Sequence, residues 1–227
     1  MSAPLRLVLF DVDGTLVDSQ SDIVDAMGAA FGAVDAALPP RATVLSGVGL
    51  SLDHLFPMLA PELSRAAHLQ MAEAYKAAYM RLRAERGVAQ SSPMYEGARD
   101  VLAHLGAQPD ILLGVATGKS RRGLDKLIEG HGLQNVFFTR QVADDHPSKP
   151  HPSMVLSALS ETGVAAENAV MIGDTSYDMD MAAAAGVRGI GVSWGYHPRE
   201  RLHQAHATID SYADLLPALD QLWSVAA

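Results

Sequence analysis

Two aspartates lie two positions apart near the start of the chain, directly after a short apolar run. The run covers residues 5–10, Asp11 and Asp13 follow it, and Gly14 comes next. Residues i and i+2 of an extended strand point to the same face, so the two carboxylates would crowd each other if strand geometry continues through them. Paired carboxylates repel unless a cation or a proton lies between them, which favours a metal site, a catalytic site or both. A helix-capping aspartate followed by an Asp-Gly turn is an alternative at this point.

Three further groups of polar residues follow apolar runs or precede helices. Thr117 and Gly118 come directly after the run at 111–116. Lys149 lies in a segment stiffened by three prolines, just before a helix-like pattern. Asp174 follows the run at 169–172, and Asp178 comes four residues later. Open α/β sheets bind ligands beyond the carboxyl ends of their strands, so these groups are candidates for one shared site.

Apolar runs and helix-like patterns alternate over most of the chain, which predicts the elements that position these groups. Strand-like runs cover 5–10, 111–116, 169–172 and 189–192, with a weaker one at 136–138. Patterns with apolar spacing near three and four cover 96–105, 121–129, 152–161, 177–185 and 212–223. Alternation of this kind implies right-handed crossovers. We therefore expect an α/β fold with a Rossmann-like parallel sheet and helices on both faces.

The stretch from residue 19 to residue 92 breaks the alternation. It shows helical patterns at 22–31, 41–45, 52–59 and 63–86, and no convincing strand. We expect an inserted, all-helical cap domain at 19–92, which splits the sheet domain into 1–18 and 93–227. A helical edge of one continuous domain is the alternative.

Composition excludes several classes of protein. The 227 residues include no cysteine, so disulfides, thiolate-bound zinc and cysteine nucleophiles are excluded. The sequence contains no run of 18 or more apolar residues, so it predicts no membrane-spanning helix. The net charge of −9 argues against a general nucleic-acid surface. We expect a cytoplasmic location, and the oligomeric state is open. An acidic protein that handles an anionic substrate needs local cations to reverse the field at its site.

In order and spacing, the polar groups resemble the four motifs of the haloacid dehalogenase superfamily. The resemblance spans the whole chain and is closest to the phosphatases with an inserted helical (C1-type) cap, among them the phosphoglycolate phosphatases. The motifs that carry it are Asp11-Val12-Asp13-Gly14-Thr15, Thr117, Lys149, and Gly173-Asp174 with Asp178.

The resemblance implies a phosphatase mechanism. Asp11 would be the nucleophile that forms an aspartyl phosphate, and Asp13 would protonate the leaving alkoxide and then activate water. Thr117 and the amide of Gly118 would hold the phosphoryl oxygens, while Lys149 offsets negative charge. Relatives that cleave carbon–halogen bonds lack an acid at the second position, so Asp13 argues against dehalogenation.

The resemblance also implies a metal cofactor. The expected ligands of Mg²⁺ are the Asp11 carboxylate, the Asp13 backbone carbonyl and Asp174, with Asp178 acting indirectly. Carboxylate, carbonyl and phosphate oxygens suit this ion, and Mn²⁺ is the alternative because it accepts similar sites.

Substrate choice is expected to reside in the helical insertion, because the sheet motifs handle only the phosphoryl group. The loop at 47–50 resembles a glycine-containing specificity loop, although an ordinary turn between helices is equally compatible. We predict Gly47, His54 and Arg41 as substrate contacts. Lys119 could add positive potential near the mouth of the site, but we expect it to be a solvated lysine at the start of a helix.

The predicted function is hydrolysis of a small phosphorylated metabolite, such as 2-phosphoglycolate or a sugar or nucleotide phosphate. A phosphomutase of the β-phosphoglucomutase type is an alternative that transfers the phosphoryl group instead. An alternative from another class is a non-catalytic phospho-aspartate signalling module, although receiver domains place the phosphorylated aspartate on a later strand and lack such an insertion.

Overall fold

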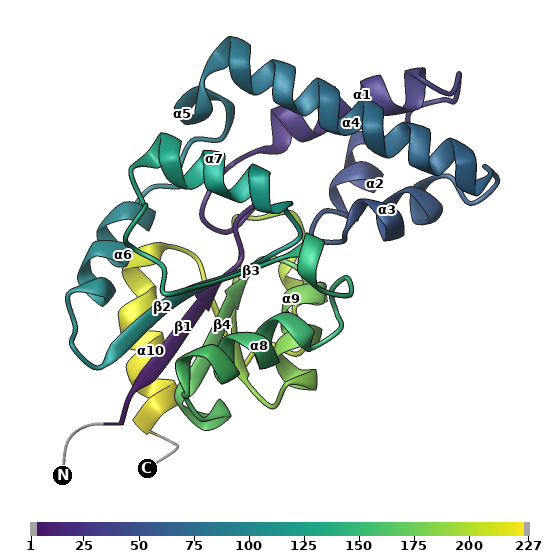
Figure 1. Cartoon of the computed structure of the whole chain (residues 1–227). Helices are drawn as coiled ribbons and strands as arrows, with labels where there is room; N and C mark the ends of the chain where they lie inside the picture. The colour runs from purple at the N-terminus through teal and green to yellow at the C-terminus, as the bar shows by residue number, and fades with distance from the viewer. Residues whose placement is uncertain (1–3, 225–227) are drawn as a thin grey trace.

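A six-stranded parallel sheet forms the centre of the protein (Figure 1). The computed structural model describes residues 4–224. The strands lie in the order β3-β2-β1-β4-β5-β6, so the direction of winding reverses between β1 and β4. Ligands of open α/β sheets bind at such a reversal. The strands are β1 (Arg6–Phe10), β2 (Ile111–Thr117), β3 (Thr139–Val142), β4 (Ala169–Gly173), β5 (Arg188–Val192) and β6 (Ala207–Ile209).

Helices cover both faces of the sheet, as predicted. Val8 and Phe10 of β1 belong to one apolar cluster, and the alternating residues Leu7 and Leu9 belong to another on the opposite face. Because both faces of β1 are buried, the strand reads as a continuous apolar run. The covering helices are α6 (Ala98–Gly106), α7 (Arg121–His131), α8 (Ser153–Thr162), α9 (Ser176–Ala184) and α10 (Leu215–Ser224).

The segment between β1 and β2 is helical and extends to one side of the sheet (Figure 1). All residues from 19 to 92 are described, and none of them forms a strand. Met27, Phe31, Phe56 and Met71 lie in an apolar cluster of its own. This arrangement is compatible with the predicted cap, whose boundaries stay a prediction. Its helices are α1 (Gln20–Gly32), α2 (Arg41–Leu45), α3 (Leu52–Leu59), α4 (Arg65–Arg86) and α5 (Val88–Ser91).

Two edge strands differ from the sequence-based expectation. The strand predicted at 136–138 is wrong: β3 begins at Thr139, and Phe138 is 62% exposed. The sixth strand, β6, was not predicted. Both strands are short and lie at the edges of the sheet. β3 consists of Thr139, Arg140, Gln141 and Val142, so it lacks a continuous apolar run although three of its four residues are buried. Within residues 4–224, no helix combines the length and the apolar character needed to cross a membrane.

Candidate active site

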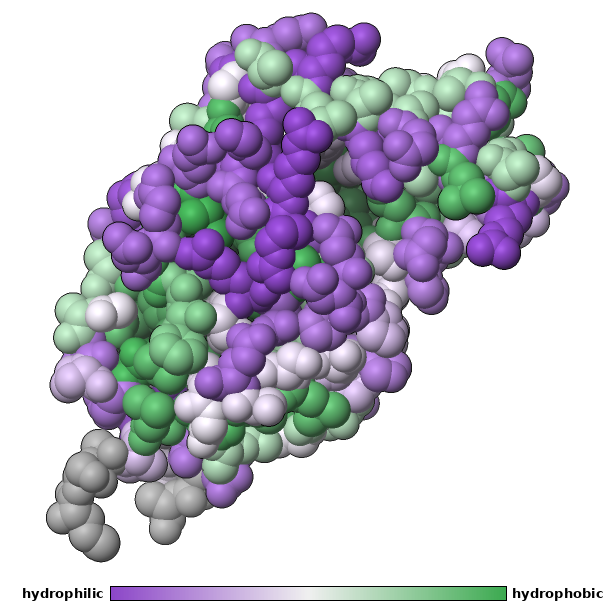
Figure 2. Space-filling model, viewed as in Figure 1, coloured by the Kyte–Doolittle hydropathy of each residue, from purple (hydrophilic) through white to green (hydrophobic). Residues whose placement is uncertain are grey.

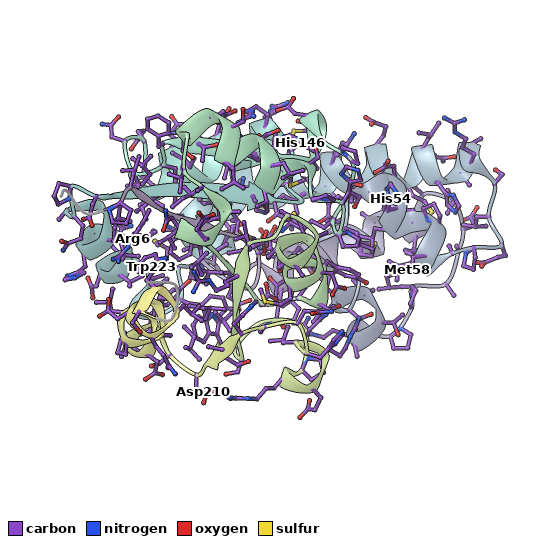
Figure 3. The ribbon with its side chains drawn as sticks, turned by 90° about the horizontal axis from the view of Figure 1, so that it is seen from below. Arg6, His54, Met58, His146, Asp210 and Trp223 are labelled. Carbon is purple, nitrogen blue, oxygen red and sulfur yellow. The ribbon has the colours of Figure 1, made fainter. Side chains whose placement is uncertain are left out.

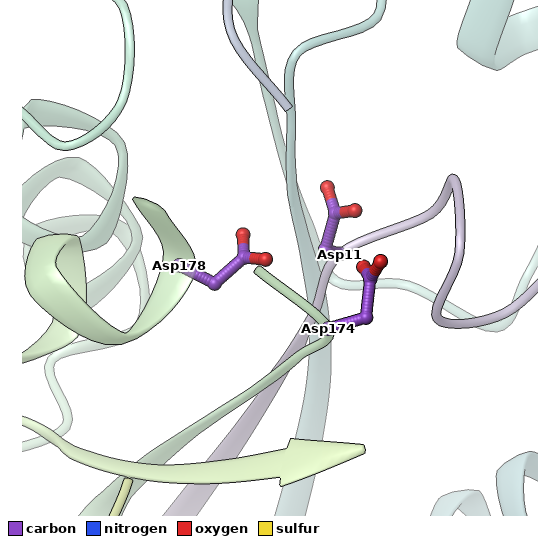
Figure 4. A group of neighbouring side chains, drawn as sticks. All are labelled: Asp11, Asp174 and Asp178. Atoms are coloured by element: carbon purple, nitrogen blue, oxygen red, sulfur yellow. The ribbon is translucent and has the colours of Figure 1, made fainter. Parts of the chain in front are cut away.

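Three aspartates converge at the reversal of the sheet (Figure 4). Asp11 directly follows β1, Asp174 directly follows the neighbouring strand β4, and Asp178 lies in the first turn of α9. One carboxylate oxygen from each residue lies within 4.8 Å of the others. None of the three residues is more than 2% exposed. Parallel strand ends thus bring together carboxylates that are more than 160 residues apart in the chain.

Lys149 provides the positive charge of this cluster. Its Nζ lies 2.6 Å from Asp11 Oδ1 and 2.6 Å from Asp178 Oδ1, and the residue is 1% exposed. Burial works against the charged form of Lys149, but the two carboxylates outweigh it and raise its pKa. The lysine is therefore charged and bonded to two of the three acids.

Carboxyl groups outnumber cationic groups in this cluster. Burial raises the pKa of Asp11 to about 7, with Asp178 adding repulsion and Lys149 opposing the shift. Burial and the other two carboxylates also raise the pKa of Asp174. Three buried carboxylates face one buried ammonium group, so a hard cation with oxygen ligands would restore the balance. The donor set fits a bound metal ion.

The surroundings of Asp174 explain two glycines. Its Oδ1 accepts a hydrogen bond from Thr15 Oγ1 at 3.0 Å, and its Oδ2 accepts one from the backbone N–H of Tyr196 at 2.8 Å. Gly14 has a φ of +84°, and a Cβ there would lie 2.2 Å from Asp174 Oδ2. A Cβ on Gly195 would lie 2.1 Å from Asp174 Cβ. Both positions need glycine because the carboxylate is packed against their backbones.

Asp178 is held by the start of α9. Thr175 and Asp178 form a capping box, in which the N–H of Thr175 donates to Asp178 Oδ2 at 3.0 Å. Lys149 occupies the other oxygen of Asp178. Because both oxygens have donors, Asp178 is well placed to orient Lys149 and poorly placed to bind a ligand directly.

Asp13 has partners different from those of Asp11. β1 ends at Phe10, so the strand geometry does not continue to Asp13, and the buried aspartate cluster does not include it. Its carboxylate accepts a hydrogen bond from Ser19 Oγ and lies 2.8 Å from Lys119 Nζ. The two aspartates that begin the first motif thus line the same cavity but belong to separate charge networks.

Lys119 is buried, so the expectation of a solvated lysine is wrong. Its side chain is 9% exposed and also donates to the hydroxyl of Tyr79, on α4, at 3.3 Å. The physical reason is the position of the residue: Ser120 caps α7, and Lys119 precedes the helix with its side chain turned toward Asp13. The signal in the sequence was the position of this lysine, directly after Thr117-Gly118 in a predicted site that is rich in aspartates.

Thr117 ends β2 and Gly118 follows it, and both line the same cavity. Thr117 is fully buried, and its Oγ1 accepts a hydrogen bond from the N–H of Lys119 at 3.2 Å. A Cβ on Gly118 would lie 2.6 Å from the carbonyl oxygen of Gly49, in the loop before α3. The close approach of this loop explains why glycine, rather than a larger residue, follows Thr117.

A cavity of about 1030 Å³ connects these groups with the helical segment. Asp11, Asp13, Thr117 and Lys119 line its sheet side, and residues of α3, α4 and the loop at 48–51 line the opposite side. The geometry therefore places the carboxylates of Asp11 and Asp13 and the side chain of Lys119 at one end of a space large enough for an organic ligand.

The three predicted substrate contacts, Gly47, His54 and Arg41, are not among the described residues that line this cavity. Gly47 belongs to the loop before α3, but its neighbours at 48–50 reach the cavity instead. Arg41 donates to Gln20 Oε1 at 3.0 Å. His54 lies 3.4 Å from Asp53 with a 58% exposed side chain, on the helical part of the molecule (Figure 3). Substrate contact by these three residues stays a prediction that the geometry does not favour.

Comparison with known proteins finds the same architecture and related sequences. The family model for haloacid dehalogenase-like hydrolases matches residues 8–192. "Probable phosphatase IndB" of Dickeya dadantii (strain 3937) is 34% identical over 221 residues, covering 95% of this chain and 94% of that protein. "Phosphoglycolate phosphatase 1" of Pseudomonas aeruginosa is 31% identical over 231 residues, covering 95% and 80%.

The fold also matches a solved structure. The crystal structure of a predicted phosphoglycolate phosphatase from Haemophilus somnus 129PT superimposes with a TM-score of 0.83 at 22% identity. The match covers 96% of this chain and 99% of that one. The shared fold therefore includes both the parallel sheet and the helical segment.

Proposed function

Because this chain belongs to the haloacid dehalogenase-like hydrolase family, we propose that it is a Mg²⁺-dependent phosphomonoester hydrolase with Asp11 as its nucleophile. The observation that carries the proposal is the state of Asp11: a buried carboxylate at a strand end, bonded to Lys149 at 2.6 Å and lining a cavity. A carboxylate in this setting is suited to covalent catalysis on phosphorus.

In the first step, a carboxylate oxygen of Asp11 attacks the phosphorus of the ester. Lys149 donates to Oδ1, which leaves Oδ2 for the attack. A bond forms between this oxygen and phosphorus while the bond from phosphorus to the alcohol oxygen breaks. Asp13, in its protonated form, gives its proton to the departing alkoxide, so the alcohol leaves neutral.

In the second step, water hydrolyses the aspartyl phosphate. Asp13, now a carboxylate, takes a proton from the water as its oxygen attacks phosphorus. The bond between phosphorus and Asp11 breaks, which regenerates the carboxylate and releases inorganic phosphate. Lys119, 2.8 Å from Asp13, and Ser19 hold the side chain of Asp13 in place through both steps.

The phosphoryl group is held by residues at the end of β2 and by Lys149, which precedes α8. We assign Thr117 and the amide of Gly118 to its oxygens, with Lys149 opposing the charge that develops. The metal would be held by the Asp11 carboxylate, the Asp13 backbone carbonyl and Asp174. When bound, Mg²⁺ or Mn²⁺ supplies positive charge against the phosphoryl oxygens. Asp178 orients Lys149.

The substrate is a small phosphorylated metabolite, and 2-phosphoglycolate is the first compound to test. The names of two relatives support this choice, since one is a probable phosphatase and the other a phosphoglycolate phosphatase. The helical segment 19–92, as the proposed cap, would supply the contacts to the alcohol.

A phosphate-release assay with Mg²⁺ over a panel of phosphorylated metabolites tests the proposal. Asp11→Asn serves as the blank, and Asp35→Asn is the matched control because Asp35 is exposed and has a positive φ that asparagine tolerates. We expect phosphate release by the wild type and by Asp35→Asn, and none by Asp11→Asn. Isomerised sugar phosphate without net phosphate release would instead identify a mutase. A stable phospho-Asp11 without turnover would identify a signalling module.

A further inference from the structure

The cavity beside Asp11 and Asp13 is large for 2-phosphoglycolate. Its volume is about 1030 Å³, which matches the upper end of the roughly 300–1,000 Å³ found for pockets that bind drug-sized ligands. The alcohol part of 2-phosphoglycolate has only two carbons, one of them a carboxylate. Such a group would leave most of the cavity filled with water.

Apolar side chains dominate the wall opposite the aspartates. Leu69 and Met80 on α4 are 59% and 44% exposed, and both line the cavity. Large apolar side chains exposed together in a concave site favour an apolar ligand, because its binding removes them from water. Figure 2 shows hydrophobic surface in the hollow beside the helical segment. Further apolar or aromatic lining residues are Leu50, Leu55, Tyr75 and Tyr79.

The apolar wall is joined directly to the proposed acid. Tyr75 and Tyr79 stack with ring centroids 5.8 Å apart. The hydroxyl of Tyr79 accepts from Lys119, and Lys119 lies 2.8 Å from Asp13. Since Asp13 protonates the leaving oxygen, the carbon attached to that oxygen starts beside Tyr79. The organic part of the ester is therefore directed along the aromatic face of α4.

The cations of the cavity wall are mostly engaged with protein groups. Lys119 pairs with Asp13, and Lys76 lies 3.0 Å from Glu73. Lys126 lies 2.7 Å from Glu129, and Arg65 and Arg122 are exposed to solvent. Arg83 donates through Nη1 to the carbonyl oxygen of Gly123 at 2.9 Å, while its buried Nε and Nη2 have no hydrogen-bond partner within residues 4–224 and its guanidinium lies 5.3 Å from the ring centroid of Tyr79. The wall on α4 thus offers mainly apolar and aromatic packing, with Arg83 as a donor for a polar group of the ligand.

We propose that the physiological substrate is a phosphate monoester of a large, mainly apolar alcohol, with an aromatic or branched aliphatic body that packs against α4. The proposal rests on the function proposed above and narrows its substrate class. Hydrolysis then releases this alcohol with the proton from Asp13, and inorganic phosphate with the oxygen from water.

A series of primary phosphate esters tests the proposal. Ethyl phosphate, 2-phosphoglycolate, glucose 6-phosphate and 2-phenylethyl phosphate all release a primary alcohol, but they differ in size and polarity. We expect kcat/KM for 2-phenylethyl phosphate to exceed each of the others by about 10-fold or more, the lower end of the discrimination that one methylene gives in an apolar pocket. A higher kcat/KM for 2-phosphoglycolate or glucose 6-phosphate would overturn the proposal.

Two substitutions on α4 locate the selectivity. Ala72 lines the cavity, whereas Ala74 on the same helix is not among its lining residues. Ala72→Leu takes up cavity volume, so the ratio of kcat/KM for 2-phenylethyl phosphate to that for ethyl phosphate should fall. Ala74→Leu should leave the ratio at the wild-type value. An unchanged ratio in Ala72→Leu, with its melting temperature matching that of Ala74→Leu, would contradict packing against α4.

The activated ester p-nitrophenyl phosphate tests the phosphatase mechanism separately from the proposed substrate class. If the wild type with Mg²⁺ hydrolyses it and Asp11→Asn does not, the phosphatase mechanism stands whatever the order of the primary esters. If no ester is hydrolysed, the proposed function fails, and the substrate class fails with it.

Discussion

The strand-end site and the cavity wall on α4 differ in how their side chains are held. Asp11 and Lys149 are at most 2% exposed, and a 2.6 Å ion pair joins them across 138 positions of the chain. Leu69 on the opposite wall is 59% exposed. Removing one member of a buried charge cluster changes the balance of all the others, whereas trimming an exposed apolar wall changes one contact. We therefore expect abrupt effects at the first region and graded effects at the second.

The largest effect is expected from Asp11→Asn. Loss of the nucleophile should lower kcat/KM by at least about 10³-fold. The same change removes one of three buried negative charges while asparagine still accepts from Lys149. The free energy of unfolding without metal should therefore rise. Urea unfolding in EDTA and phosphate release with Mg²⁺ measure the two effects.

The opposite signs of these effects separate chemistry from folding. If Asp11→Asn lost both activity and stability, Asp11 would be a structural group. The proposed difference between the strand-end site and the cavity wall would then be wrong. Asp35→Asn, at an exposed position, should change neither quantity.

The next largest effect is expected from Lys149→Met. This change leaves three buried carboxylates without their buried cation, which should cost about 3–5 kcal/mol of unfolding free energy in metal-free buffer. Lys126→Met is the matched control, since its pair with Glu129 is more than half exposed and should contribute little. Urea denaturation of both variants checks the difference. Equal losses would mean that burial does not set the energetics of the site.

The sequence predicts the first region far better than the second. Asp11, Thr117 and Asp174 each lie at or directly after the end of a buried strand, so the apolar run marks their position in the sheet and the parallel topology brings them together. Lys149 precedes a helix in a segment with three prolines, and its family motif identified it. The parallel sheet with helices on both faces is confirmed for the same reason.

The contacts of the helical segment leave no such local pattern. Lys119 meets Tyr79 across 40 positions, and neither residue has neighbours that indicate the pairing. The glycines of the loop at 47–50 mark a turn, but they do not tell which residue faces the cavity. Gly49 does so, and Gly47 does not. Side-chain direction within an irregular loop depends on packing that periodicity does not contain.

Metal removal should have a pH-dependent effect of intermediate size. Burial raises the pKa of Asp11 to about 7. The folded pKa lies above the unfolded value, so the metal-free protein loses stability as pH rises through about 7, and a cation offsets this loss. Below pH 7 the ion must displace a proton. Its apparent Kd should weaken by up to about tenfold per pH unit for one displaced proton.

Thermal shifts with and without Mg²⁺ at pH 6 and pH 8 measure this competition. The stabilisation by Mg²⁺ should be larger at pH 8. In Asp11→Asn the pH dependence of this stabilisation should be reduced, because one of the two proposed metal ligands with a raised pKa, Asp11 and Asp174, no longer takes up a proton. A stabilisation independent of pH in the wild type would show that metal and proton do not share Asp11.

The smallest effect is expected at His197, which lies between α9 of the sheet domain and the end of α2 in the helical segment. Its Nδ1 accepts the N–H of Ser176, on α9, at 3.0 Å, and its Nε2 lies 2.8 Å from the carbonyl oxygen of Ser46, at the end of α2. A ring that accepts at Nδ1 and donates from Nε2 is neutral. Burial lowers the pKa of His197, and Arg201 lowers it further, while the Ser46 carbonyl and Asp178 oppose the shift.

The sign of the pH effect follows from this lowered pKa. The contribution of His197 is complete above the unfolded value near 6.5 and is lost as pH falls from there toward the folded pKa. The loss is at most about 1.4 kcal/mol for each pH unit over which the unfolded state holds one more proton. His197→Asn keeps an acceptor for Ser176 but does not titrate, so its unfolding free energy should fall less than that of the wild type between pH 7 and pH 5. His104→Asn, at an exposed position on α6, should match the wild type.

Protonation of His197 breaks its bond to Ser176, so the contact between the helical segment and the sheet should weaken before the buried charge cluster does. Identical pH dependence in His197→Asn and wild type would place the acid-sensitive contact elsewhere in the molecule.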